Sequence, residues 1–258
     1  MHINNILEYM NEIAPCHIAE NFDNVGLIID TGKKNINKVM LALDVTDNVV
    51  SEAIENNIDM IITHHPMIFS KIKKIDNSPL GKRIVKLIKH NISVYTSHTN
   101  LDKSPCGTNN YLFEKLEFTN KEPLDNGELS SCLGLIGETN LNIDDLIIKV
   151  KKVLGLEYLN CYFSNNNLIS KVAILTGSGC DYEYLQYAIT KNCNVFISGD
   201  ATYHKAQFAI ENGLTIIDAS HYATEFLVLD NMKKLIEDKF KDIDIIITKT
   251  NGQILKIV

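Results

Sequence analysis

Six side chains of the kinds that bind metal ions follow the ends of expected β-strands. They are His64, His65, His98, Asp102, His221 and Glu225. Imidazole nitrogens and carboxylates are ligands for divalent transition metals, and the absence of thiolates from this set argues against a closed structural zinc site. Because ligands of βαβ sheets bind outside the carboxyl ends of the strands, these positions favour a metal site with coordination places open to water.

Two of the candidate groups share one spacing, a histidine followed four residues later by an acid. His98 stands in this relation to Asp102, and His221 to Glu225. Residues four apart lie on one face of a helix if a helix starts at the histidine, so His221 and Glu225 would bind one ion or bridge two. Plain structural roles are open too, since Asp102 would serve as a helix cap and Glu225 as a solvated helix residue.

The adjacent histidines raise a geometric question. His64 and His65 come directly after the apolar run MIIT. Adjacent residues on an extended chain point to opposite faces, so a bend at the strand end is required to aim both rings at one ion. Without that bend, the two would be a polar pair that hydrogen-bonds a loop.

An internal repeat places the two His-to-acid motifs in equivalent positions. Residues 38–65 and 171–200 both read as Lys-Val-strand, turn, helix, strand and a polar pair. The repeat continues, because residues 87–102 match residues 208–225. Each of these two segments ends in a histidine, three residues and an acid. This equivalence favours metal binding over separate structural roles for the individual residues.

The elements expected around the motifs alternate between strands and helices, which is typical of an α/β protein. A helix is expected over Ile3–Ile13, and an apolar strand over residues 38–46 ends at the helix-capping Thr46. We therefore expect two copies of one α/β unit, roughly 38–102 and 171–225, joined by a connection over 103–170.

Composition narrows the class of protein. The chain has 258 residues, 45% hydrophobic and 22% charged, which is ordinary globular usage, and its formal charge of −7 disfavours a nucleic-acid binder. No apolar run approaches the ~20 residues of a membrane span, and the N-terminus lacks the features of a signal peptide. The six cysteines are scattered without C-x-x-C spacing, which predicts reduced thiols in a cytoplasmic protein.

Weaker motifs are also present. The stretch TGSGCDY at residues 176–182 would let backbone amides approach a phosphate, but a plain strand-to-helix turn is the favoured interpretation. No nucleophile-elbow sequence surrounds Ser178 or Cys180. The lysine cluster at residues 71–75 is expected to be a solvated loop.

Five stretches together resemble a known family. They are ENFDNVGL (20–27), THHPMIF (63–69), SHTNLD (97–102), SGDATYHKA (198–206) and DASHYATE (218–225). In this order they resemble the NIF3-like proteins, also named homologues of GTP cyclohydrolase I type 2. Phe22 stands where that family commonly has Trp, and Ser220 where Gly commonly precedes the histidine. Ser220 puts the local backbone path in question, because a residue with a side chain disfavours positive φ.

The resemblance implies a NIF3-like fold, in which two similar, intertwined α/β lobes with mixed sheets form one domain over residues 1–258 around a dinuclear metal site. It implies two divalent ions per chain (Zn, Fe, Mn, Co or Ni). By carry-over, the ligands would be His64, His65, Asp102, His221 and Glu225. His98 would orient a ligand or transfer protons, and His204 is a further pocket candidate. The resemblance also implies a homo-oligomer, a hexameric ring, and the connection over 103–170 is too short for the inserted domain of longer members.

The function implied is that of a metal-dependent hydrolase in which two ions activate a water. The substrate would be a guanine nucleotide attacked at its imidazole ring carbon with release of formate, although a phosphoester would suit the same geometry. The alternative is a metal-binding oligomeric scaffold or regulatory interaction protein without turnover, because fold does not imply activity.

Overall fold

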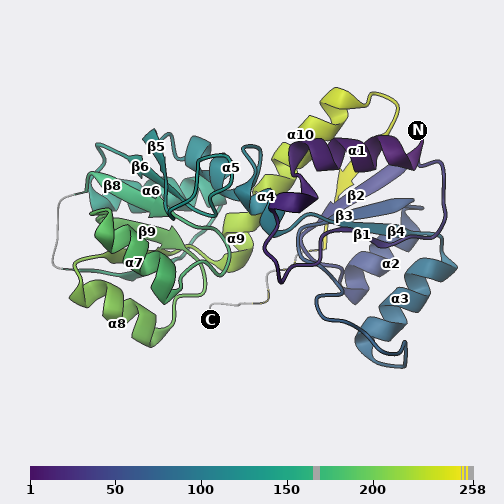
Figure 1. The fold of residues 1–258 in the computed structure, drawn as a ribbon, viewed down its shortest axis with the longest axis horizontal. Coiled ribbons are helices and arrows are strands. Elements are labelled where there is room, and N and C mark those ends of the chain that lie inside the picture. Colours follow the sequence, from purple (N-terminus) through teal and green to yellow (C-terminus); the bar gives the residue numbers. More distant parts are fainter. Residues whose placement is uncertain (165–168, 251, 253, 255–258) are drawn as a thin grey trace. The chain divides into compact units, whose positions relative to one another are not determined.

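The two repeat segments lie in separate units of the chain in the computed structural model (Figure 1), which describes residues 1–164, 169–250, 252 and 254. Unit 1 comprises Met1–Leu101 and Leu229–Val258, and unit 2 comprises Asp102–Val228. The chain thus leaves unit 1 to build unit 2 and then returns to unit 1.

Unit 1 is built on a five-stranded mixed sheet in the order β1-β4-β3-β2-β11. The strands are β1 (Gly26–Ile29), β2 (Lys38–Ala42), β3 (Met60–Thr63), β4 (Ser93–Thr96) and β11 (Asp244–Ile247). Strands β11, β2, β3 and β4 run parallel, and β1 pairs with β4 in the antiparallel sense. The carboxyl ends of β3 and β4 therefore meet at one edge of the sheet.

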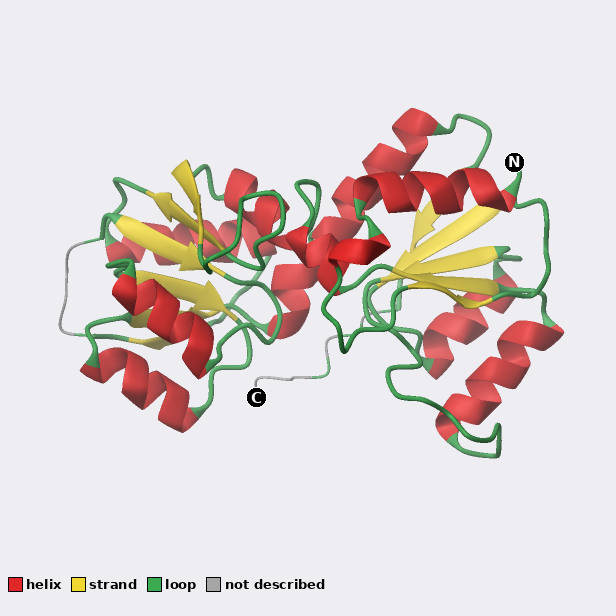
Figure 2. Ribbon diagram, in the orientation of Figure 1, coloured by secondary structure: helices red, strands yellow, loops and turns green. Residues whose placement is uncertain are grey.

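Helices cover both faces of this sheet, as Figure 2 shows. The helical elements of unit 1 are α1 (Ile3–Ile13), the 3-10 turn η1 (Cys16–Ile18), α2 (Asp47–Glu55), α3 (Pro79–Lys89) and α10 (Val228–Lys239). Helices α1 and α10 lie on one face, and α2 and α3 on the other. Met40 and Ile61 of the sheet are fully buried in one cluster with Val50 of α2 and Leu87 of α3. Burial on both faces explains why the parallel strands read as continuous apolar runs.

Unit 2 contains a six-stranded mixed sheet in the order β5-β6-β8-β9-β10-β7. The strands are β5 (Thr119–Pro123), β6 (Leu135–Glu138), β7 (Asn160–Tyr162), β8 (Lys171–Ile174), β9 (Val195–Ser198) and β10 (Thr215–Asp218). Strands β8, β9 and β10 are parallel, whereas β5, β6 and β7 add antiparallel pairings at the two sides.

The helices of unit 2 enclose its sheet from two sides. They are α5 (Thr108–Lys115), α6 (Ile143–Leu154), α7 (Tyr182–Thr190), α8 (Tyr203–Glu211) and α9 (His221–Phe226), and the short α4 (Thr99–Lys103) crosses the boundary between the units. Val172 and Ile174 pack in a cluster with α5 and α6, while Ala173 packs in a second cluster with α7 and α8. This alternation along β8 follows from the two-residue period of a strand.

The repeat expected from the sequence has a structural counterpart. The series β2-α2-β3-α3-β4-α4 and β8-α7-β9-α8-β10-α9 follow the same order, and each places three parallel strands side by side. The segment 103–170, described above as a connection, supplies α5, β5, β6, α6 and β7 to unit 2, and its residues 165–168 lie outside the described part.

Local signals locate several element ends. Helix α1 spans Ile3–Ile13 as expected. The strand expected over 38–46 ends at Ala42, and Thr46 caps α2 because its hydroxyl accepts a hydrogen bond from the Val49 amide at 3.2 Å. Within the described part of the chain, no helix is both long and apolar enough to cross a membrane.

Candidate metal centre

Three histidine rings gather at the carboxyl ends of β3 and β4 in unit 1. The ring centroids lie 5.0 Å apart for His64 and His65, 5.2 Å for His64 and His98, and 5.6 Å for His65 and His98. One nitrogen from each ring can be chosen so that all three lie within 4.8 Å of one another, a spacing at which they could hold a metal ion. Both adjacent histidines therefore contribute to one cluster, an arrangement for which a bend at the strand end was expected.

The adjacent histidines are each hydrogen-bonded through Nδ1. His64 Nδ1 lies 3.0 Å from the carbonyl oxygen of Ser97, and His65 Nδ1 lies 3.0 Å from Oδ1 of Asp44. Neither a carbonyl nor an ionised carboxylate can donate, so Nδ1 must carry the proton in both rings. The ring lone pair is then on Nε2, the nitrogen available for metal coordination.

His98 is held by a buried carboxylate from the loop before β1. Its Nδ1 lies 2.9 Å from Oδ1 of Asp23, while the other carboxylate oxygen accepts from the amide and hydroxyl of Thr99. Burial alone would raise the pKa of Asp23, but the hydrogen bonds from His98 and Thr99 outweigh it and lower the pKa well below its usual range. Asp23 thus stays ionised at neutral pH and fixes the orientation of His98.

Asp102 begins unit 2 inside the short helix α4. The Thr108 hydroxyl donates to Oδ1 of Asp102 at 2.6 Å, and the Asn109 side chain donates to its backbone carbonyl at 3.1 Å. Both donors are buried, so the half-buried Asp102 is held at its carboxylate by Thr108 and at its main chain by Asn109.

His221 and Glu225 form a close pair on α9. His221 Nε2 lies 3.1 Å from Oε2 of Glu225, and His221 Nδ1 lies 2.7 Å from Oδ2 of Asp200. The hydrogen bond to Glu225 raises the pKa of His221 to about 9; burial opposes this rise, and Asp200 adds to it. A metal ion bound at Nε2 must therefore displace a proton from this pair.

Two glycines make room for this pair. Gly177 has φ +67°, and a Cβ there would lie 2.0 Å from Oε1 of Glu225. A Cβ on Gly199 would lie 2.4 Å from the backbone nitrogen of His221. Any side chain at either position would push the pair out of place.

Ser220, the residue before α9, has the positive φ that a residue with a side chain disfavours. Ser220 has φ 69° and ψ 134°, and its side chain accepts from the Ala223 amide as the N-cap of α9. A residue other than glycine at such an angle stores strain, and strained residues cluster at functional sites.

Other candidates from the sequence do not join these groups. His204 is exposed on α8, where its ring packs against Tyr203 with centroids 5.2 Å apart. Asp181 caps α7 and accepts from the Tyr182 amide at 2.6 Å, so a carboxylate already stands at the helix end where a phosphate was considered. Cys180 is 1% exposed and burial raises the pKa of its thiol to about 12, which disfavours a nucleophile.

The carboxylates that orient the histidines are not among the candidate site residues predicted from the sequence. These are Asp23, Asp44 and Asp200. Asp23 and Asp200 occur inside the stretches ENFDNVGL and SGDATYHKA, and Asp44 follows the apolar run of β2. An acid directly after a buried strand is the one local signal that pointed toward Asp44.

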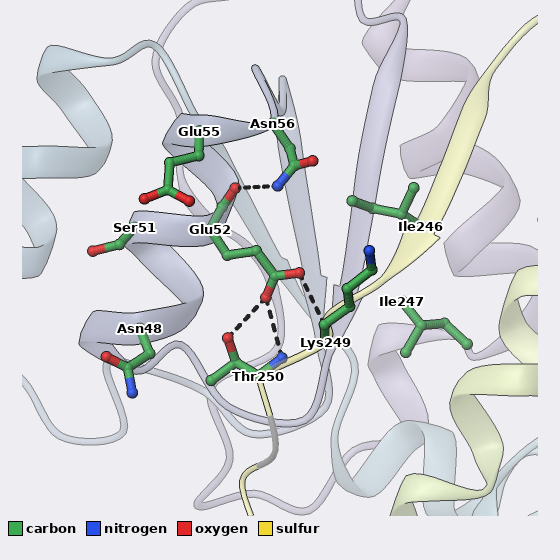
Figure 3. Close-up of a pocket in the computed structure, with 9 residues that line it drawn as sticks. All are labelled: Asn48, Ser51, Glu52, Glu55, Asn56, Ile246, Ile247, Lys249 and Thr250. Atoms are coloured by element: carbon green, nitrogen blue, oxygen red, sulfur yellow. Dashed lines mark hydrogen bonds between the residues drawn. The ribbon is translucent and has the colours of Figure 1, made fainter.

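A hollow of about 490 Å³, lined mainly by polar residues, lies in unit 1 (Figure 3). Its lining residues are Asn48, Ser51, Glu52, Glu55, Asn56, Ile246, Ile247, Lys249 and Thr250. The Glu52 carboxylate accepts from the amides of Lys249 and Thr250 at 2.9 and 3.2 Å, and from the Thr250 hydroxyl at 2.8 Å. Glu52 therefore anchors the segment after β11 to α2, and no candidate ligand lines this hollow.

A family profile and individual proteins of known sequence match most of this chain. The profile of the family described as Duf34/NIF3 (NGG1p interacting factor 3) matches residues 1–253. A GTP cyclohydrolase 1 type 2 homolog of Clostridium perfringens is 35% identical over 256 residues, covering 96% of this chain and 97% of its own. The GTP cyclohydrolase 1 type 2 of Helicobacter pylori is 32% identical over 225 residues, covering 86% of each chain.

Solved structures share the whole fold. The hypothetical protein SA1388 of Staphylococcus aureus matches with a TM-score of 0.91 at 27% identity, over 100% of this chain and 99% of its own. Reduced HcgD from Methanocaldococcus jannaschii matches with a TM-score of 0.88 at 28% identity, over 97% and 98% of the two chains. These matches confirm the α/β fold with two mixed sheets expected from the sequence. The chain belongs to the Duf34/NIF3 (NGG1p interacting factor 3) family.

Proposed function

We propose that this protein is a metal-dependent hydrolase in which two divalent ions activate a water for attack on a nucleotide. The observation that carries the proposal is the hydrogen bonding of the candidate histidines. His64, His65 and His221 each face an oxygen acceptor through Nδ1. Histidines that bind metals through Nε2 are oriented in this way by carbonyls and carboxylates.

The proposed ligand set consists of His64, His65, Asp102, His221 and Glu225. Nitrogen and oxygen donors of this kind suit Zn, Fe, Mn, Co or Ni. The donor chemistry and the glycine at 177, which leaves space for the Glu225 carboxylate, support this assignment.

Bound ions would lower the pKa of a water and polarise the group under attack. His98 is proposed to accept and return a proton at Nε2, because its Nδ1 is held by the ionised Asp23. The negative charge of Asp23 would stabilise the imidazolium that forms. A ligand role for His98 is also compatible with its place in the histidine cluster.

The nucleotide substrate is supported by the names of the relatives, of which the protein from Helicobacter pylori is named GTP cyclohydrolase 1 type 2. The proposed reaction is hydrolytic opening of the imidazole ring of GTP with release of formate. A homohexameric ring remains a prediction of the resemblance, and a cytoplasmic location remains a prediction from the scattered cysteines. Light scattering on the purified protein would measure the number of chains per particle.

The test combines elemental analysis of protein purified without added metal or chelator with a formate-release assay on GTP. We expect about two transition-metal ions per chain and turnover that depends on them. His65→Ala and Glu225→Ala should both lower the metal content while the protein stays folded. His90→Ala is the matched control, because His90 is an exposed residue at the end of α3.

Two results would contradict the proposal. Unchanged metal content in both His65→Ala and Glu225→Ala would refute the ligand set. Bound metal without turnover of GTP or of a generic phosphodiester would refute the hydrolase and favour a metal-binding scaffold.

A further inference from the structure

We propose that Thr176 and Gly177, which follow β8 in unit 2, are positioning residues that hold Asp102 on one side and the His221–Glu225 pair on the other. The inference rests on the proposed metal-binding role of those three residues. It assigns a role to the glycine-containing turn at 176–182, where neither a phosphate site nor a nucleophile is supported.

A chain of two hydroxyl groups joins Thr176 to Asp102. The Thr176 hydroxyl donates to Oγ1 of Thr108 at 2.9 Å, and the Thr108 hydroxyl donates to Oδ1 of Asp102 at 2.6 Å. The carboxylate can only accept, which fixes the direction of both hydrogen bonds. Both threonines are buried, at 6% and 1% exposure, so water does not compete for these groups. These two hydrogen bonds fix the rotation of the Asp102 carboxylate.

The same residue is tied to the backbone of Asp102 through Asn109. The Thr176 amide donates to Oδ1 of Asn109 at 2.8 Å, and Nδ2 of Asn109 donates to the carbonyl of Asp102 at 3.1 Å. Asn109 is 1% exposed. The side chain and the main chain of Asp102 are therefore both linked by hydrogen bonds to the residue that follows β8.

Gly177 makes the corresponding contact with α9. Its amide donates to Oγ1 of Thr224 at 3.0 Å, and the Thr224 hydroxyl lies 3.0 Å from the carbonyl of His221. The missing side chain of Gly177 leaves the space that Glu225 occupies. Two neighbouring residues are thus linked to both candidate ligand groups of unit 2, through the side chains of Thr108, Asn109 and Thr224.

Buried hydrogen-bond chains polarise one another and hold their members in one arrangement. Removing a partner that orients a metal ligand typically costs about 10- to 100-fold in metal affinity. A purely structural role would lower the stability of the fold and leave the metal affinity unchanged, so the two roles are separable by experiment.

The test measures the affinity of the full-length protein for Zn²⁺ by competition with a chromogenic chelator, and the urea midpoint of the metal-free protein. Thr108→Val removes the hydroxyl at constant shape and should weaken Zn²⁺ binding about 10-fold or more. Thr108→Ser keeps the hydroxyl and should restore most of the affinity. Thr176→Val should resemble Thr108→Val, and the double variant should lose little more, because the two hydroxyls act through one chain.

Thr215→Val is the matched control. Thr215 is a buried threonine at the start of β10 whose hydroxyl is hydrogen-bonded to Ser164 at 3.1 Å. This variant should lower the urea midpoint without changing the affinity for Zn²⁺. Gly177→Ala is a second probe and should weaken Zn²⁺ binding, because the methyl group displaces Glu225.

Equal Zn²⁺ affinity in the wild type, Thr108→Val and Thr176→Val would overturn the positioning role while leaving the metal site intact. Absence of Zn²⁺ binding by the wild type would instead overturn the proposed metal site, and this inference with it.

Discussion

The two units use equivalent strand ends differently. After β3, unit 1 places His65 in the histidine cluster, whereas after β9 unit 2 has Asp200, which hydrogen-bonds His221. His98 of unit 1 obtains its carboxylate from Asp23, which lies outside the repeated segment. One position of the repeat thus supplies a candidate ligand in unit 1 and an orienting acid in unit 2.

The two orienting acids also differ in their surroundings. The side chain of Asp23 is 0% exposed, whereas that of Asp200 is 57% exposed. A hydrogen bond to a buried charge contributes more to stability than one at the surface, where water competes and salt screens. We therefore expect the unit 1 pair to contribute to the stability of the fold, and the unit 2 pair to add little beyond orientation.

The largest effect is expected from removing these charges. Asp23→Asn should lower the free energy of unfolding by about 2 kcal/mol, while Asp200→Asn should lower it by less than about 1 kcal/mol. Urea denaturation of the metal-free protein measures both. Equal losses would show that burial does not distinguish the two pairs.

A smaller effect is expected where the backbone before the histidine differs. Ser220, which precedes His221, has φ 69°. Ser97, which precedes His98, does not have a positive φ. Ser220→Gly should raise the free energy of unfolding by about 1 kcal/mol, because relief of strain exceeds the few tenths lost with the cap. The equivalent Ser97→Gly should lower the free energy of unfolding, because glycine relieves no strain there and only adds conformational entropy to the unfolded chain.

Thermal or urea midpoints of the two serine variants provide the measurement. A loss of stability in Ser220→Gly would mean that the serine cap outweighs the strain.

The smallest effect is expected from a pair of carboxylates with opposite pKa shifts. Burial would raise the pKa of Glu52, but hydrogen bonds from Lys249, Thr248 and Thr250 lower it below the ordinary 4.5. Its contribution to stability is thus present above pH 4.5 and is lost as the pH falls through the lowered pKa. Asp218 behaves oppositely, because burial raises its pKa above the ordinary 3.8, so its contribution is lost as the pH rises through the raised pKa.

Urea midpoints measured across the acidic range test these signs. Glu52→Gln should reduce the loss of stability on acidification, and Asp218→Asn should reduce the loss as the pH rises. An unchanged pH profile in both variants would contradict the assignments.

Much of the repeated framework could be predicted from the sequence. The apolar run before His64 and the capping Thr46 mark their elements because strand and cap signals are local. The spacing of His221 and Glu225 predicted a pair on one helix face, and α9 begins at His221.

The contacts that orient the histidines could not be predicted in the same way. Asp23 and His98 are 75 residues apart, and no periodic pattern records such a pairing. The same holds for the Thr176 hydroxyl and Thr108, which are 68 residues apart. Long-range polar contacts depend on the finished fold, whereas periodicity reports only the elements.

In the proposed metal site, Nε2 of His64 and of His65 binds metal while Nδ1 donates to the protein. Long-range ¹H–¹⁵N NMR of the imidazole rings during titration with Zn²⁺ detects both features. We predict that His64 and His65 carry their proton on Nδ1 before and after addition, and that Zn²⁺ shifts the Nε2 resonances of both. A proton on Nε2, or Nε2 resonances that do not respond to Zn²⁺, would rule out this mode of metal binding.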